Sequence, residues 1–74
     1  NRHRPWLFWD PLMKASTLGL LNNKAKGQEF AQKLLQLRPD FPQKGRQLIG
    51  NFIKFEEIAW RIEEGLRRVG LEIL

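Results

Sequence analysis

The chain has 74 residues, 42% of them hydrophobic and 28% charged, which is typical of one small folded domain rather than a disordered segment. It has no cysteine and no tyrosine, and its only histidine and only serine are His3 and Ser16. Disulfides and thiolate metal sites are therefore excluded, and we expect no enzyme activity, cofactor or metal centre.

No apolar run approaches the roughly 18 residues that a membrane-spanning helix requires. We therefore expect a soluble, cytoplasmic protein that does not bind membranes. The first residue is Asn1 and not Met, so we also expect the chain to be part of a longer protein.

The net charge of +5 is unevenly distributed. Residues 1–54 hold ten basic and three acidic side chains, whereas residues 55–74 hold three basic and five acidic ones. The two parts of the chain should therefore present different surfaces to a partner.

The first predicted helix spans residues 11–21, with Asp10 as its N-cap and Pro11 in its first turn, although it could begin as early as Pro5. Asn22 and Asn23 supply a tight turn, because asparagine tolerates positive φ, and Asn23 can cap a second helix over residues 24–37.

Two prolines, Pro39 and Pro42, interrupt the helical pattern and predict a turn over residues 37–42. A third helix is expected over 43–53, with Pro42 close to its start.

The last helix, over residues 55–69, has the clearest amphipathic pattern, and Gly70 is a natural left-handed stop for it. Glutamate and arginine four residues apart predict three ion pairs along its polar side. These pairs are Glu57 with Arg61, Glu63 with Arg67, and Glu64 with Arg68.

No segment alternates with the period of a strand, so the predicted fold class is all-α. Four short antiparallel helices should form two consecutive helical hairpins, because the connections are short. The predicted shared core comprises Phe30, Leu34, Leu48, Phe52, Ile58, Ile62 and Leu66.

Residues 11–42 read PLMKASTLGLLNNKAKGQEFAQKLLQLRPDFP. This stretch resembles a tetratricopeptide repeat in its small and large apolar positions and its closing proline. The matching residues are Ala15, Leu18, Gly27, Phe30, Ala31, Leu35, Leu37 and Pro39, whereas Lys14 and Leu34 depart from the pattern. The resemblance implies a repeat-like hairpin over residues 10–41, a capping hairpin over 42–74, and a protein-interaction or scaffold role.

The end of the chain adds a narrower resemblance. Residues 65–70 read GLRRVG, similar to the closing sequence of multidomain bacterial signalling proteins that carry such repeats behind a cyclase-like or regulatory domain. This implies a module that binds a partner or a neighbouring domain of its own chain, or a purely structural cap.

In that family the ligand groove is lined by the first helix of each hairpin. The positions that the resemblance assigns to it are Trp9, Leu12, Ser16 and Leu20, followed by Gln43, Arg46, Gly50 and Lys54. The second set is basic and favours an acidic peptide or a C-terminal carboxylate. The alternative is a solvated basic face with no ligand.

Four consecutive apolar residues occupy positions 6–9, and one helix face cannot bury them all. We therefore expect docking onto another domain or weak homodimerisation, unless part of the set merely covers the end of the core. The candidate contact residues are Trp6, Phe8, Trp9 and Trp60. Trp60 lies on a polar helix face, and the alternative for it is packing against residues 71–74.

Nucleic acid is the alternative partner, because the chain is basic. The basic residues are scattered, however, and the acidic last helix would repel phosphates. The sequence therefore favours a protein or peptide as the partner.

Overall fold

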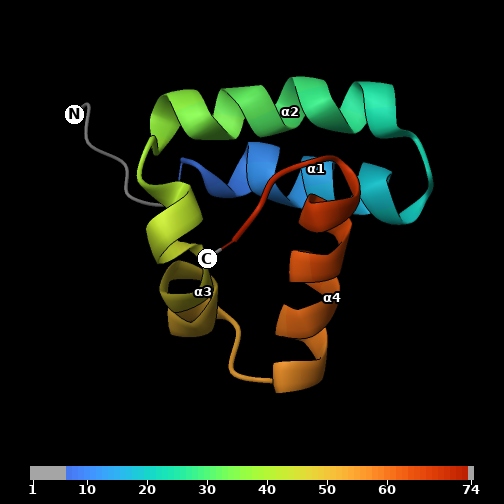
Figure 1. Ribbon diagram of the computed structural model, residues 1–74. Helices are drawn as coiled ribbons and strands as arrows, with labels where there is room; N and C mark the ends of the chain where they lie inside the picture. The colour runs from blue at the N-terminus through green and yellow to red at the C-terminus, as the bar shows by residue number, and fades with distance from the viewer. Residues whose placement is uncertain (1–6, 74) are drawn as a thin grey trace.

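The computed structural model describes residues 7–73, which form four helices joined by short connections (Figure 1). The helices are α1 (Trp9–Leu20), α2 (Lys24–Leu37), α3 (Phe41–Phe52) and α4 (Glu56–Arg68). The described chain contains no strand. The all-α prediction is confirmed, and the predicted helices differ from the observed ones by one or two residues at most ends.

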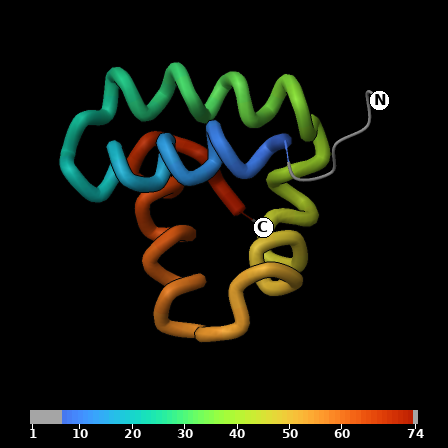
Figure 2. Tube along the Cα trace, turned by 180° about the vertical axis from the view of Figure 1, so that it is seen from behind, coloured from blue at the N-terminus to red at the C-terminus, as the bar shows by residue number. Residues whose placement is uncertain are grey.

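Helix α1 is the central element. It lies antiparallel to α2 on one side and is crossed by α4 on the other, as Figures 1 and 2 show from opposite directions. Helices α3 and α4 run across the α1–α2 layer rather than along it. The α3–α4 hairpin projects from that layer, and its two helices contact each other much less than α1 contacts α2 or α4.

Local sequence signals explain where three helices begin or end. At the end of α1, Asn22 has a φ of 65°, and the Asn23 amide donates to the Leu18 carbonyl. The Asn23 side chain then accepts from the Lys26 amide and caps α2. Gly70 has a φ of 90° and ends α4 in the same way as Asn22 ends α1, which confirms both turn predictions.

The prediction that Asp10 caps α1 was wrong. The helix begins at Trp9, and Phe8 occupies the capping position without a side-chain hydrogen bond. Asp10 instead lies in the first turn, where its charge favours the helix dipole and pairs with Lys14 at 3.2 Å.

The core gathers side chains from all four helices and from the returning C-terminal segment. Its largest fully buried members are Phe41, Leu12, Leu34, Ile49 and Leu66. Leu71 is also buried, and Ile73 packs against this core, so residues 71–73 return to cover it.

The predicted core was right for Leu34, Ile62 and Leu66 and wrong for Phe52 and Ile58, which are about half exposed. The buried positions of α4 begin only at Ile62, where α1 crosses the helix. The apolar stripe of α4 therefore continues beyond the surface that α1 covers. Phe30 and Leu48 are partly buried against the core.

Candidate protein-docking site

Ser16, expected on a ligand groove, lies inside the protein instead. Its residue is 2% exposed, and its hydroxyl donates to the Ile62 carbonyl at 2.9 Å. Leu12 is fully buried and Trp9 partly buried. This face of α1 therefore does not form an open groove: α4 covers it at Ser16, Phe8 and Phe52 pack on Trp9, and only Leu20 at the end of the helix is exposed.

Glycines bring α1 and α4 together at this point. A Cβ atom added to Gly19 would clash with the Gly65 carbonyl, and one added to Gly65 would clash with the Ser16 backbone. Only backbones without side chains can approach this closely. The crossing therefore excludes any ligand between α1 and α4.

The predicted α3 positions have a different environment. Between α3 and α4 lies an open pocket of about 420 Å³, to which both helices and their connection contribute. Its lining residues are Arg46, Gly50, Ile53, Lys54, Glu56, Ala59, Trp60 and Glu63. The structure thus brings Arg46 and Lys54 together with Trp60, whereas Gln43 is exposed on α3 outside this lining.

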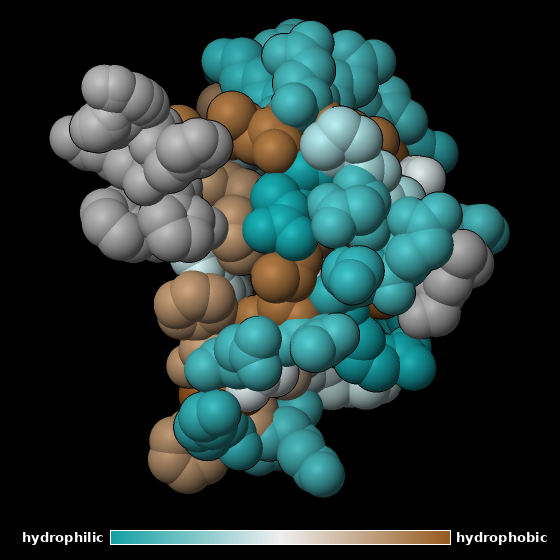
Figure 3. Space-filling model, turned by 90° about the vertical axis from the view of Figure 1, so that its left-hand side faces the viewer, coloured by the Kyte–Doolittle hydropathy of each residue, from teal (hydrophilic) through white to brown (hydrophobic). Residues whose placement is uncertain are grey.

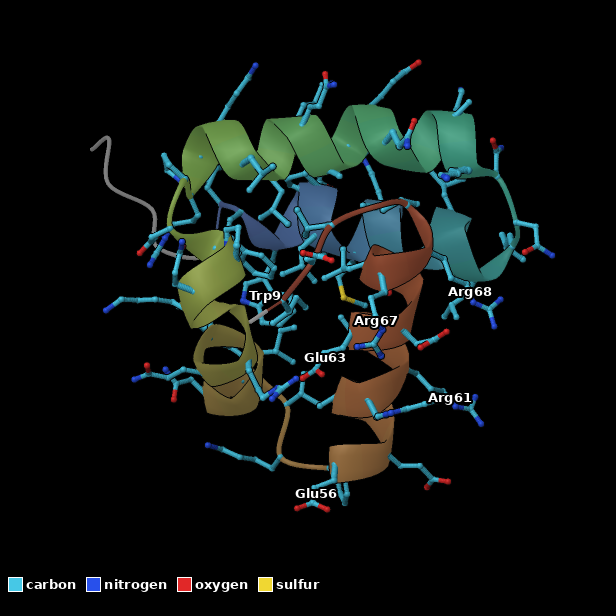
Figure 4. All side chains as sticks on the ribbon, viewed as in Figure 1. Trp9, Glu56, Arg61, Glu63, Arg67 and Arg68 are labelled. Carbon is cyan, nitrogen blue, oxygen red and sulfur yellow. The ribbon has the colours of Figure 1, made fainter. Side chains whose placement is uncertain are left out.

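Charged side chains from both helices meet in this pocket. Glu63 points from α4 towards α3 (Figure 4), and its Oε1 lies 3.6 Å from Nε of Arg46. The predicted partner of Glu63 was Arg67, which pairs with Glu64 instead. Lys54 donates only a long bond of 3.4 Å to the Gly50 carbonyl, so its ammonium group remains largely available.

Four apolar side chains on α3, α4 and their connection are about half exposed or more. They are Phe52, Phe55, Ile58 and Trp60, which are 53%, 72%, 49% and 59% exposed. In Figure 3, which looks onto the α3 side, apolar surface reaches the lower end of the molecule among polar side chains.

Gly50 differs from the other glycines. A Cβ atom added there would meet nothing within 4 Å, and its backbone is helical. The packing of neighbouring atoms explains Gly19, Gly27, Gly45 and Gly65, and positive φ explains Gly70. Glycine inside a helix costs about 0.5–1 kcal/mol relative to alanine, so Gly50 lowers stability while leaving the pocket open.

The aromatic side chains of Phe8 and Trp9, near the N-terminus, pack on each other and on Phe52. Phe8 is buried and stacks on Trp9 with 5.6 Å between ring centroids, and Phe52 meets Trp9 edge-on at 5.1 Å. Trp9 Nε1 is buried without an acceptor among the described residues. Phe8 and Trp9 are thus largely occupied within the fold, Leu7 is exposed, and Trp6 lies outside the described residues.

Trp60 does not pack on the C-terminal segment. It lines the α3–α4 pocket, whereas residues 71–73 line pockets with α2 and the start of α3. The alternative interpretation of Trp60 as a cover for residues 71–74 gains no support from residues 71–73, and Leu74 lies outside the described residues.

Two of the ion-pair groups outside the pocket lower the pKa of their carboxylate. Hydrogen bonding from Arg38 holds the pKa of Asp40 below its usual value. Hydrogen bonds from Arg67 and Arg68 likewise lower the pKa of Glu64, which confirms the predicted pair of Glu64 with Arg68. Both carboxylates are therefore kept charged and paired, as expected of structural surface groups.

Residues 7–73 contain no cluster of three or more potential metal-ligating His, Cys, Asp or Glu side chains. Within the same residues, no helix has the length and apolar character needed to cross a bilayer. Comparison of the chain with known protein families, characterised proteins and solved structures found no significant match.

Proposed function

We propose that this protein is an interaction module that binds a peptide or protein segment on the α3–α4 hairpin. The observation that carries the proposal is the open pocket in which exposed Trp60 lies with Arg46 and Lys54. The role agrees with the one implied by the tetratricopeptide-repeat resemblance, in which such a module contacts a partner or a neighbouring domain. The surface differs, because Leu12 and Ser16, at the middle of that groove, are buried within the fold.

The apolar part of the pocket suits protein side chains. Tryptophan is enriched at the energetic centres of protein interfaces, where it offers a large rigid surface with a polar edge. Beside Trp60, Ile53 and Ala59 provide aliphatic walls. The volume of about 420 Å³ is in the range of pockets that accept small ligands, and so it can receive a few side chains.

The charged part of the pocket favours an acidic partner. Glu63 is already paired with Arg46, but their 3.6 Å separation is too long for a hydrogen bond, so the five guanidinium N–H donors stay free of that carboxylate. These donors and the ammonium group of Lys54 can bind carboxylates. A segment that combines acidic and apolar side chains therefore fits best.

A nucleic acid fits this pocket less well. Phosphates repeat along the whole backbone of a nucleic acid, and binding them needs a continuous basic surface, whereas here two cations alone line the pocket and share it with two anions.

The test is a titration of the ¹⁵N-labelled protein with three probes. NMR monitors the indole N–H signal of Trp60 during each titration. The probes are a synthetic peptide in which glutamate alternates with leucine and phenylalanine, its lysine-for-glutamate counterpart, and a short DNA duplex. We expect the acidic peptide to shift the Trp60 signal and the basic peptide to leave it unchanged. DNA should bind only at low salt.

Charge-reversal variants locate the site. Changing Arg46 and Lys54 together to Glu should abolish the response to the acidic peptide. Changing Lys24 and Lys26 to Glu on exposed positions of α2 gives the same change in net charge and should preserve it. Equal losses in both variants, or DNA binding at physiological salt that exceeds peptide binding, would contradict the proposal.

A further inference from the structure

The start of α4 has the chemistry that the pocket favours in a ligand. Residues 55–58 read FEEI, which places two carboxylates between two apolar side chains. Phe55 is 72% exposed and does not line the pocket of its own chain. Both the ligand-like segment and the pocket therefore lie at the same end of the molecule.

We infer that the occupant of the α3–α4 pocket is the 55–58 segment of a second copy of this chain. This inference rests on the proposed function, because it names the partner of the same surface. A patch that carries both a pocket and a matching projection is self-complementary. Two copies related by a two-fold axis can then each insert Phe55 into the pocket of the other, and the assembly closes as a dimer.

Charge complementarity supports a second copy as the occupant. The pocket is lined by Arg46 and Lys54 together with Glu56 and Glu63, and Glu63 already pairs with Arg46, so Lys54 is the cation left for an anion of a second copy. A two-fold arrangement pairs Lys54 of each copy with Glu57 of the other, so each ion pair forms twice. Glu57 is exposed and lies outside the pocket lining of its own chain, which leaves it able to make this contact.

The shape of the pocket supports the same arrangement. A phenylalanine ring needs a flat apolar surface with space above it. Gly50 provides open space where any other residue would place a side chain, and Trp60 and Ile53 provide apolar walls. The dimer thus gives Gly50 a role that packing within one chain does not.

The first experiment measures the oligomeric state of the whole chain by sedimentation equilibrium up to a few hundred micromolar. We expect a concentration-dependent dimer. Phe55→Ser should weaken association by about tenfold or more, because it removes the inserted ring. Leu21→Ser is the matched control, since Leu21 is 70% exposed at the distant α1–α2 turn, and it should leave association unchanged.

A charge swap tests the geometry of the contact. Lys54→Glu should weaken the dimer, because two like-charged contacts with Glu57 replace two ion pairs. Adding Glu57→Lys to the same chain should restore association, since each pair forms again with its signs reversed. Circular dichroism of each variant shows whether the helices remain folded.

Each outcome bears on the inference. A strictly monomeric protein would overturn it, and if the acidic peptide still shifted Trp60, the proposed function would stand with a different partner. A dimer that resists Phe55→Ser would also overturn it, and loss of that dimer in Trp6→Ala would place the contact near the N-terminus. Loss of association in Phe55→Ser and Lys54→Glu, with rescue by Glu57→Lys, supports it.

Discussion

Helix α4 makes two very different contacts along its length. In its C-terminal half the backbone of Gly65 touches that of Ser16 and Gly19 on α1, and the Ser16 hydroxyl bonds across the interface. In its N-terminal half the helix faces α3 across an open pocket and carries exposed Ile58 and Trp60. One half packs tightly within the fold, and the other half leaves large apolar side chains exposed.

Glycine serves opposite purposes in these two regions. At the α1–α4 crossing, the absence of a Cβ atom at Gly19 and Gly65 lets the two backbones touch. At Gly50 it leaves a space that the chain itself does not fill. Glycine therefore occurs both where two helix backbones touch and where no neighbouring atom limits the side chain. Replacing each glycine by a larger residue distinguishes the two roles.

The largest expected effect is at the crossing. Gly65→Ala places a methyl group against the Ser16 backbone, which cannot move without displacing α1. We expect the free energy of unfolding to fall by about 3 kcal/mol or more, which is a large part of the total stability of so small a domain. Urea denaturation followed by circular dichroism measures it. A stabilised variant, as helix propensity alone predicts, would show that the helices are not in contact there.

Two isoleucines on α4 give the next comparison. Ile62 is buried under α1, so Ile62→Ala should cost about 2–4 kcal/mol. Ile58 is half exposed beyond the crossing, and Ile58→Ala should cost less than about 1 kcal/mol. Equal losses in the same denaturation assay would mean that the whole stripe is core.

A smaller effect is expected from the hydrogen bond across the crossing. Ser16→Ala removes the donor to the Ile62 carbonyl and should lower the free energy of unfolding by about 1 kcal/mol. Thr17→Ala, one position along α1 on its exposed side, is the control and should have little effect on the same measurement. If the two variants lose equal stability, the hydroxyl contributes no specific bond.

Sequence reasoning predicted the helices well because their limits depend on local chemistry. Asn22, Gly70 and Pro42 act through their own backbone conformations, which periodicity and turn preferences capture. The burial of Ser16 and the exposure of Phe52 depend instead on which helix crosses which. A helical pattern identifies an apolar face but not how far its partner extends.

The candidate site was only partly predictable for the same reason. The resemblance assigned Arg46, Gly50 and Lys54 to a groove, Trp60 was singled out as an aromatic residue on a polar face, and the fold unites all four in one pocket. That Gly50 has open surroundings is visible only in three dimensions. For the crossing, small residues at positions 15, 16 and 19 were an available signal of close helix packing.

The most direct test of the account combines stability and binding in Gly50→Gln. Glutamine favours a helix over glycine and carries no charge, and position 50 has open space for its side chain. We predict a free energy of unfolding raised by about 0.5 kcal/mol, together with weaker association and a weaker Trp60 response to the acidic peptide. A destabilised variant, or one that binds as well as the unmodified protein, would contradict the claim that the α3–α4 pocket is kept open for a partner.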